Sequence, residues 1–229
     1  FCHAIRRNVN MLYVLENNGV YGLTKGQFSA SADVGSTARK GGAVNQQPPI
    51  DPVLTAINFG CTFVARGFSG DKQNLVPLLK AAIRHPGFAL LDVLSPCVTF
   101  NDHEGSTKSY AYTRESERTT VYADFIPSRE PIETDRVQDV TTITLHDGSR
   151  IVLRKVDNDY NPLDAGAATA YIRDHQDEGE IVTGLLYINE EAQDLHAMNN
   201  TSNPPLSTLE LSKLIPGAAK LAALQKAWR

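Results

Sequence analysis

The sequence predicts an α/β protein in which a parallel sheet is covered by helices, and two observations support this class. Short apolar runs at residues 11–15, 62–65 and 88–94 have the length and composition of strands in a parallel sheet. Segments with a helical pattern lie between them, at residues 51–60 and 75–85. Repeated β-loop-α units of this kind imply parallel strands with helices packed on the sheet.

The boundaries of these elements follow from local chemistry. The first helix is predicted to begin at Asp51, because Asp is a favoured N-cap and Pro52 suits the first helical position, and Gly60 ends it. The second helix stops at Pro86-Gly87. The Gly-, Ser- and Ala-rich residues 26–47 are predicted to be mostly loop, and a loop of this length indicates a functional role.

The pattern changes near residue 101, so we predict two domains, residues 1–100 and residues 101–229. Residues 101–135 are polar, interrupted by proline, and without a strong period. Asp147-Gly148 favours a tight hairpin turn between two apolar runs. The elements predicted in this second part are a hairpin over 142–156, a helix over 163–176, a strand over 181–188 and an amphipathic helix over 217–228.

The composition is typical of a soluble globular protein, with 41% hydrophobic and 21% charged residues among 229. No apolar run approaches the ~20 residues that cross a bilayer, so no membrane partner is expected. The net charge of −4 argues against a nucleic-acid partner. The chain opens in FCHAIRRNVN, where HAIRRN has the pattern of the later turns of a helix, so we expect further residues before it.

The three cysteines, Cys2, Cys61 and Cys97, are too few and too widely spaced for a disulfide framework. This usage fits a reducing cytoplasm, which is the predicted localisation. Cys2 and Cys61 lie among apolar neighbours and are predicted to be small buried hydrophobes. Two groups of polar residues, 102–104 and 174–178, contain metal-ligating types, but their spacing favours solvated surface over a metal site.

The first predicted strand ends in Asn17-Asn18-Gly19. Ligands of parallel sheets bind beyond the carboxyl ends of the strands. Mg²⁺ that bridges a diphosphate takes oxygen ligands, which an Asn amide and a backbone carbonyl two residues later can supply. Glycines would let the backbone approach the phosphates. The alternative is that the tripeptide is only a turn.

Several segments together resemble one family. VLENNGVYGLTKGQ is similar to the second half of the thiamine diphosphate motif, and with HAIRRN and DVLSPCVTFN it resembles the β subunits of 2-oxoacid:ferredoxin oxidoreductases, nearest to the 2-oxoglutarate type. HDGSRIVLRKVDNDYNP and GEIVTGLLYIN extend the likeness more loosely. The resemblance implies a thiamine-diphosphate-binding fold whose C-terminal part is residues 1–100. Residues 101–229 would form a C-terminal extension with a β-hairpin and helices.

The resemblance also implies a set of site residues. Mg²⁺ would be bound by the side chain of Asn18 and the carbonyl of Val20, while Asn17 could merely brace the turn. Gly22 and Thr24 would lie along the diphosphate and thiazolium.

Two further roles follow from the same likeness. Leu23 and Lys25 would face the substrate, where an ammonium group favours the second carboxylate of 2-oxoglutarate over pyruvate. Cys97 would be the fourth ligand of a [4Fe–4S] cluster. Such a cluster needs about four thiolates, which three scattered cysteines do not provide.

The activity implied is oxidative decarboxylation of 2-oxoglutarate with coenzyme A to succinyl-CoA and CO₂, with electrons passing through a [4Fe–4S] cluster to ferredoxin. The glutamate that activates the thiamine would come from an α subunit in a heterotetramer, so no catalytic residue is assigned to this chain. Three alternatives remain open: a pyruvate or broad-range member of the family, a cluster-free thiamine-dependent decarboxylase, and a non-catalytic scaffold subunit.

Overall fold

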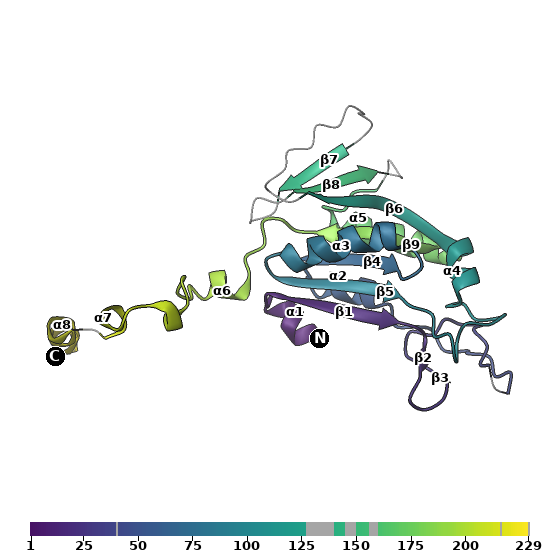
Figure 1. Ribbon diagram of the computed structural model, residues 1–229, viewed down its shortest axis with the longest axis horizontal. Coiled ribbons are helices and arrows are strands. Elements are labelled where there is room, and N and C mark those ends of the chain that lie inside the picture. The colour runs from purple at the N-terminus through teal and green to yellow at the C-terminus, as the bar shows by residue number, and fades with distance from the viewer. Residues whose placement is uncertain (40, 127–139, 145–149, 156–159, 216, 229) are drawn as a thin grey trace. The chain divides into compact units, whose positions relative to one another are not determined.

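The computed structural model describes residues 1–39, 41–126, 140–144, 150–155, 160–215 and 217–228. The chain forms two compact units, Phe1–Leu195 and His196–Arg229. The first unit is built on a seven-stranded sheet in the order β1-β5-β4-β9-β6-β8-β7 (Figure 1). Helices pack on this sheet, so the predicted α/β class is confirmed.

The parallel part of the sheet consists of β1 (Met11–Asn17), β5 (Phe88–Leu94) and β4 (Phe63–Phe68). Its register pairs Asn17 with Leu94, and Leu94 in turn pairs with the last residue of β4. The carboxyl ends of the three strands therefore meet at one edge of the sheet. The loops that follow β1 and β5 both leave from this edge.

The rest of the sheet, formed by strands from the second predicted part of the chain, contains both parallel and antiparallel pairs. β9 (Ile181–Ile188) runs antiparallel to β4, and β6 (Glu117–Ile126) runs parallel to β9. The predicted hairpin is confirmed as β7 (Val140–Thr144) and β8 (Arg150–Lys155), while its turn lies outside the described residues. Strands from both sides of residue 100 thus join one sheet, and residue 100 does not divide two compact units.

The region after residue 100 contains regular structure that the sequence did not indicate. A helix, α4 (Tyr110–Ser116), begins after Ser109, whose hydroxyl accepts a hydrogen bond from the amide of Tyr112. It leads directly into the ten-residue strand β6. The sequence of β6 has no clear hydrophobic period, so it did not indicate a strand. β6 is instead specified by its pairing with β9 and β8, which come much later in the chain.

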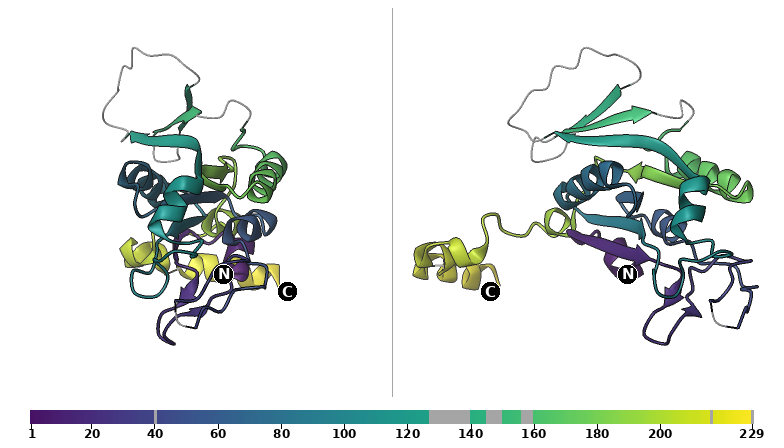
Figure 2. Two further views of the ribbon diagram at one scale, coloured as in Figure 1. Left: turned by 90° about the vertical axis from the view of Figure 1, so that its right-hand side faces the viewer. Right: turned by 45° about the vertical axis from the view of Figure 1, so that its right-hand side comes forward.

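Helices cover both faces of the sheet (Figure 2). α3 (Lys72–Arg84) packs on one face, whereas α2 (Pro52–Asn58) and α5 (Ala165–Asp177) contact each other and pack on the opposite face. The short α1 (Cys2–Arg6) adds Ile5 to the core. The largest fully buried side chains of the core are Tyr160, Phe63, Phe68, Phe88, Ile5, Leu78, Leu90, Leu91 and Ile172.

The strand β1 is less buried than its apolar sequence predicts. It lies at the edge of the sheet, and Met11 and Val14 are 39% and 46% exposed. β4 and β5 are buried along their whole length, because each has a strand on either side. The prediction of a parallel strand is confirmed, but the prediction of a buried one is wrong, because only Asn17 among the seven residues of β1 is buried and three are exposed.

A buried ion-pair network lies on the face that α2 covers. Arg66 on β4 donates to Asp92 on β5 at 2.8 Å and to Asp51 at 2.7 Å. Asp51 also accepts hydrogen bonds from the amides of Val53 and Leu54, which confirms it as the N-cap of α2. Burial opposes ionisation of Asp51, but the charge and hydrogen bonds of Arg66 together with the capping amides lower its pKa below 3.8.

The second unit contains short helices. α6 (Leu195–Met198) spans the division between the units, and η1 (Leu206–Thr208), α7 (Leu211–Leu214) and α8 (Ala218–Ala227) follow. α8 confirms the predicted final helix. None of the described side chains in this unit is buried. Within the described part of the chain, no helix has the length and apolar character needed to span a bilayer.

Candidate functional site

The loop after β1 begins with an Asx turn at Asn18. The side-chain oxygen of Asn18 accepts a hydrogen bond from the amide of Val20 at 3.1 Å. Gly19 has φ +71°, and a Cβ there would approach Asn101 Nδ2 and Lys108 Cγ to 3.0 Å. Glycine is therefore required at this position for two reasons, its positive φ and the close approach of the neighbouring side chains.

A single buried amide joins this loop to the loop that follows β5. The Nδ2 of Asn101 donates to the backbone oxygen of Asn18 at 2.8 Å. The backbone amide of Asn101 donates to the oxygen of Cys97 at 2.8 Å. Asn101 is 2% exposed, and its own Oδ1 accepts from Ser106 at 2.8 Å. The two loops that the sequence singled out therefore lie together.

Asn17 braces the same site from the end of the strand. Its side-chain oxygen accepts a hydrogen bond from the hydroxyl of Ser31 at 2.7 Å. Its backbone oxygen accepts from the amide of Ser95 at 3.0 Å, which extends the pairing of β1 with β5 by one residue. Asn17 thus ties the long loop over residues 26–47 to the strand ends. This agrees with the role of turn brace considered for it above.

A partly buried ion pair lies next to these loops. Lys108 is 9% exposed, and its Nζ lies 2.9 Å from the carboxylate of Asp33. The hydroxyl of Thr107 donates to the same carboxylate at 2.7 Å. Neither Asn101 nor Lys108 was identified from the sequence as a site residue, although Asn101 ends the segment DVLSPCVTFN that carried the family resemblance. Lys108 had no such signal, since its partner lies 75 residues earlier in the chain.

The residues expected to contact the cofactor and the substrate follow Asn18 in the same loop. β2 (Val20–Tyr21) and β3 (Gln27–Phe28) form a two-stranded ribbon, and residues 22–26 connect them. Val20 is buried, whereas Gly22, Thr24 and the two substrate candidates are exposed; Leu23 is 98% exposed. The hydroxyl of Thr24 donates to the oxygen of Tyr21 at 3.3 Å.

The connection ends at a cavity of about 740 Å³. Lys25 lies on its wall with φ +71°, a conformation uncommon for residues other than glycine. Next to it, Gly26 packs closely on Phe100, because a Cβ on this glycine would come within 3.3 Å of the Phe100 Cβ. The walls come from three loops: Lys25, Gly26, Gln27 and Phe28, then Ala38, Arg39 and Ala43, and finally Thr99 and Phe100.

The three cysteines do not lie in one cluster of ligands. Cys61 is buried in the core and its thiol donates to the oxygens of Phe63 and Phe88. Burial raises its pKa to about 11, so this thiol does not provide a thiolate at neutral pH. Cys2, on α1, is partly exposed, which corrects its prediction as a buried residue. Cys97 is partly exposed beside the site.

A four-thiolate cluster therefore does not fit the cysteines of this chain alone. Of the three in the sequence, only Cys97 lies in the loop that joins the candidate site. A [4Fe–4S] cluster takes about four thiolates. Cys97 can supply one of them, and the remaining ligands would have to come from other residues than those of this sequence.

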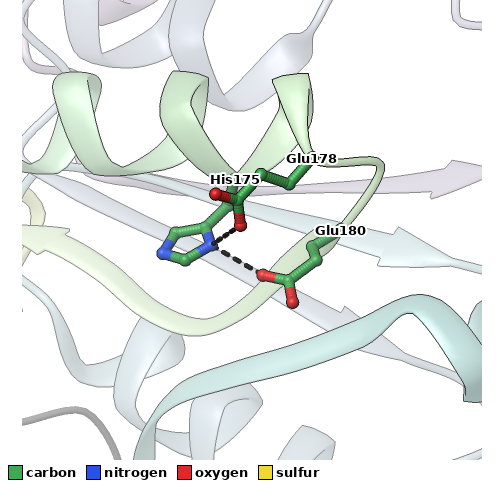
Figure 3. Close-up of side chains that lie close together, drawn as sticks. All are labelled: His175, Glu178 and Glu180. Atoms are coloured by element: carbon green, nitrogen blue, oxygen red, sulfur yellow. Dashed lines mark hydrogen bonds and ion pairs between the residues drawn. The ribbon is translucent and has the colours of Figure 1, made fainter.

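Metal-ligating side chains also gather at the end of α5, away from these loops in the sequence. Nδ1 of His175 lies 2.6 Å from the carboxylate of Glu180 and 3.7 Å from that of Glu178 (Figure 3). Glu180 is further paired with Arg118 at 3.3 Å. The imidazole nitrogen and the carboxylate thus satisfy each other without a metal, and the group ties α5 to β6. The solvated helix end predicted for residues 174–178 is confirmed at four of these five residues, which are exposed, whereas His175 is partly buried.

The comparison with known protein families agrees with the geometry of the site. Residues 1–93 match the family described as "Thiamine pyrophosphate enzyme, C-terminal TPP binding domain". This stretch contains β1, the Asn18 loop, β4 and most of β5.

Curated relatives match over about half of the chain. A 2-oxoacid:ferredoxin oxidoreductase β subunit from Sulfolobus is 48% identical over 44% of this chain and 33% of its own length. The corresponding subunit from Saccharolobus solfataricus is 42% identical over 58% of this chain and 41% of its own length. The KorB subunit of a 2-oxoglutarate oxidoreductase from Mycobacterium tuberculosis is 41% identical over 44% of this chain and 27% of its own length. The matched part of this chain thus spans less than half the length of these relatives.

A solved structure is similar over nearly the whole chain. It is a 2-oxoglutarate:ferredoxin oxidoreductase from Magnetococcus marinus with 2-oxoglutarate, coenzyme A and succinyl-CoA bound. The TM-score is 0.64 at 28% identity, covering 97% of this chain and 60% of that one. Together with the match to the thiamine pyrophosphate domain, these comparisons make the chain similar to the β subunits of 2-oxoacid:ferredoxin oxidoreductases in sequence and to a 2-oxoglutarate:ferredoxin oxidoreductase in fold.

Proposed function

We propose that this chain is the thiamine-diphosphate-binding subunit of an enzyme that oxidatively decarboxylates a 2-oxo acid, with 2-oxoglutarate as the preferred substrate. The observation that carries the proposal is the bridge from Asn101 to the backbone of Asn18. It holds the loop with the metal-ligand candidates against the loop with Cys97. Homologues named for 2-oxoacids and for 2-oxoglutarate support the substrate class.

The residues of the Asn18 loop are suited to Mg²⁺ and a diphosphate. Mg²⁺ takes oxygen ligands, and an amide oxygen has two lone pairs. The Oδ1 of Asn18 uses one of them for the amide of Val20, which leaves the other for the metal. The carbonyl of Val20 would be the second protein ligand. Gly22 has no heavy atom within 4 Å of the position of a Cβ, so a diphosphate could pass along its backbone, with Thr24 beside it.

The bound cofactor would supply the electron sink that permits loss of CO₂ from the 2-oxo acid. This chain would hold the cofactor, orient it and bind the substrate. Leu23 and Lys25 would face the substrate, and the ammonium group of Lys25 would attract a carboxylate. Coenzyme A would accept the acyl group, giving succinyl-CoA from 2-oxoglutarate.

Two further components belong to the proposal. An α subunit would contribute the glutamate that activates the thiamine, so that the complete site forms in a cytoplasmic heterotetramer. Ferredoxin would receive the electrons, with Cys97 as one ligand of a [4Fe–4S] cluster whose other ligands this sequence does not contain. A cluster-free thiamine-dependent decarboxylase is the second candidate.

The role of Asn18 can be tested in the complex of this chain with its α subunit. We expect Asn18→Ala to lose most of its bound thiamine diphosphate and Mg²⁺, because a metal ligand is removed. Asn18→Asp keeps an oxygen at the same place and should retain more of both. The measurement is the content of thiamine and magnesium in the purified complex, followed by turnover of 2-oxoglutarate.

Asn10→Ala is the matched control, since Asn10 is exposed and precedes β1 at the opposite end of the strand. Unchanged thiamine content in Asn18→Ala would contradict the assignment. Absence of thiamine from the unsubstituted complex would favour a scaffold subunit. Visible iron–sulfur absorbance in the active complex would separate the first candidate from the cluster-free decarboxylase.

A further inference from the structure

The cavity beside the cofactor loop has two cations and mostly apolar walls. Lys25 and Arg39 contribute the charges, and among the described residues no carboxylate pairs with either of them. Phe28, Phe100 and two alanines line much of the remainder. A cavity of about 740 Å³ lies within the range of about 300–1,000 Å³ that small-molecule sites occupy. Its chemistry suits an organic anion with an apolar middle.

Arg39 is joined to the loop after β5 by one hydrogen bond within the part of the chain that the structure describes. Its Nη1 donates to the backbone oxygen of Thr99 at 2.5 Å. A guanidinium has five N–H donors in a rigid plane, so most of them stay available for a ligand. The bond joins a residue of the long loop over 26–47 to the loop that follows β5, two positions after Cys97. The side chain of Arg39 is exposed, and this bond positions it at the wall of the cavity.

Lys25 approaches the same cavity in a left-handed conformation. Glycine or asparagine usually occupies such a position, and a lysine there costs conformational energy. The turn is closed by hydrogen bonds from the amides of Lys25 to Gly22 and of Gly26 to Tyr21. Nothing in these backbone contacts requires a lysine side chain. A role for the side chain at the ligand accounts for its presence.

We propose that Arg39 and Lys25 together bind the terminal carboxylate of a dicarboxylic 2-oxo acid, and that Arg39 is a determinant of substrate specificity. The inference rests on the proposed function and adds to it a second cation from a different loop. A planar guanidinium binds a carboxylate through two parallel hydrogen bonds, which a lone ammonium cannot do. The apolar walls would contact the methylene groups between the two ends of the substrate.

The test compares substrates in the complex of this chain with its α subunit. We expect Arg39→Met to raise the KM for 2-oxoglutarate by about tenfold or more, since a charge-assisted bidentate contact is lost. The KM for pyruvate should change less than about twofold, because pyruvate has no second carboxylate. Arg39→Lys should give a KM for 2-oxoglutarate between those of the unsubstituted complex and Arg39→Met, since lysine keeps the charge but lacks the planar guanidinium group. Lys25→Met should show the same selectivity as Arg39→Met.

Binding without turnover provides a second readout. Glutarate has two carboxylates and pentanoate has one, and calorimetry of the complex should show that Arg39→Met weakens binding of glutarate alone. Arg7→Met is the matched control, because Arg7 is exposed and precedes β1 at the end remote from the loops. Arg7→Met should change neither the KM for 2-oxoglutarate nor the KM for pyruvate.

Three results would overturn the inference. They are an equal rise in KM for both substrates, an unchanged affinity for glutarate, and a rise confined to the KM for coenzyme A. A rise confined to the KM for coenzyme A would mean that the two cations bind a phosphate of coenzyme A. Comparing the KM for dephospho-coenzyme A would then show whether that phosphate is the 3′-phosphate. All three leave thiamine bound to the complex, whereas failure of the proposed function would appear as a complex without thiamine.

Discussion

At the scale of single residues, the site depends on Asn101 as much as on the predicted ligand Asn18. Asn101 contacts both loops through separate groups, its side-chain amide on one side and its backbone amide on the other. Being buried, it has no water to replace these bonds. Asn101 therefore helps to fix the positions of Asn18 and Cys97 relative to each other, together with the pairing of β1 with β5, although it has no predicted chemical role of its own.

We expect Asn101→Ala to lower the free energy of unfolding of the full chain by about 1–3 kcal/mol, because buried hydrogen-bonding groups lose their partner. It should also weaken thiamine diphosphate binding, since the two loops are no longer joined. Denaturant unfolding and calorimetry with thiamine diphosphate and Mg²⁺ measure the two effects. Ser106→Ala is the control, as it removes a donor to Asn101 but leaves the bridge to Asn18. If both variants bound the cofactor equally well, the bridge would not position the loop.

At the scale of secondary-structure elements, the ion pairs of Arg66 hold α2 to the strands beneath it. Arg66 is buried, and its two carboxylate partners come from the N-cap of α2 and from β5. Although burial favours the neutral form of Arg66, the two carboxylates raise its pKa, so the guanidinium stays charged. Removing one partner of such a pair leaves a buried charge with less compensation.

The pKa of Asp51 predicts a loss of stability in acid. Because the folded pKa of Asp51 is lowered, the ionised carboxylate contributes stability that is fully present above the ordinary aspartate pKa of 3.8 and is lost as the pH falls from there through the lowered folded pKa. Asp51→Asn keeps a good N-cap but removes the charge. We expect it to destabilise the chain by up to ~3–5 kcal/mol at pH 7 and to remove this part of the pH dependence. Urea unfolding between pH 3 and pH 7 measures both, and parallel curves for the two proteins would contradict the assignment.

At the scale of the whole molecule, the folded core belongs to one of the two compact units. Every residue of the hydrophobic core cluster lies within Phe1–Leu195. The second unit has several exposed large apolar side chains, among them Leu211, Ile215 and Trp228. Since the burial of apolar surface is the main favourable term in folding, we assign the stability of the first unit to its own core.

Removal of residues 203–229 should therefore leave the thermal unfolding midpoint of the remaining chain nearly unchanged. The shortened chain keeps all strands of the sheet and the helices that cover it. Differential scanning calorimetry of the full and shortened chains measures the midpoint. A fall of several degrees would mean that the second unit contributes to the stability of the first.

The sequence by itself determined the local elements and the candidate loops. Apolar runs and capping residues predicted β5 and β9 with the bounds that the structure shows, and Asp51 as the start of α2. The segment around Asn18 resembles part of the thiamine diphosphate motif, and the residues that carry this resemblance are adjacent in the chain. Such signals are local, and local propensities largely decide them. The ligand roles of Asn18, Val20 and Cys97 stay predictions.

Only the tertiary structure decided which distant residues meet. Asn101 reaches Asn18 across 83 residues, and Arg39 reaches Thr99 across 60. The mixed sheet, the edge position of β1 and the length of β6 likewise depend on strand order. No periodicity along the chain encodes these contacts, since they follow from register between strands that are paired only in the folded state. The cavity and its two cations arise from that register, through the loops that it brings together.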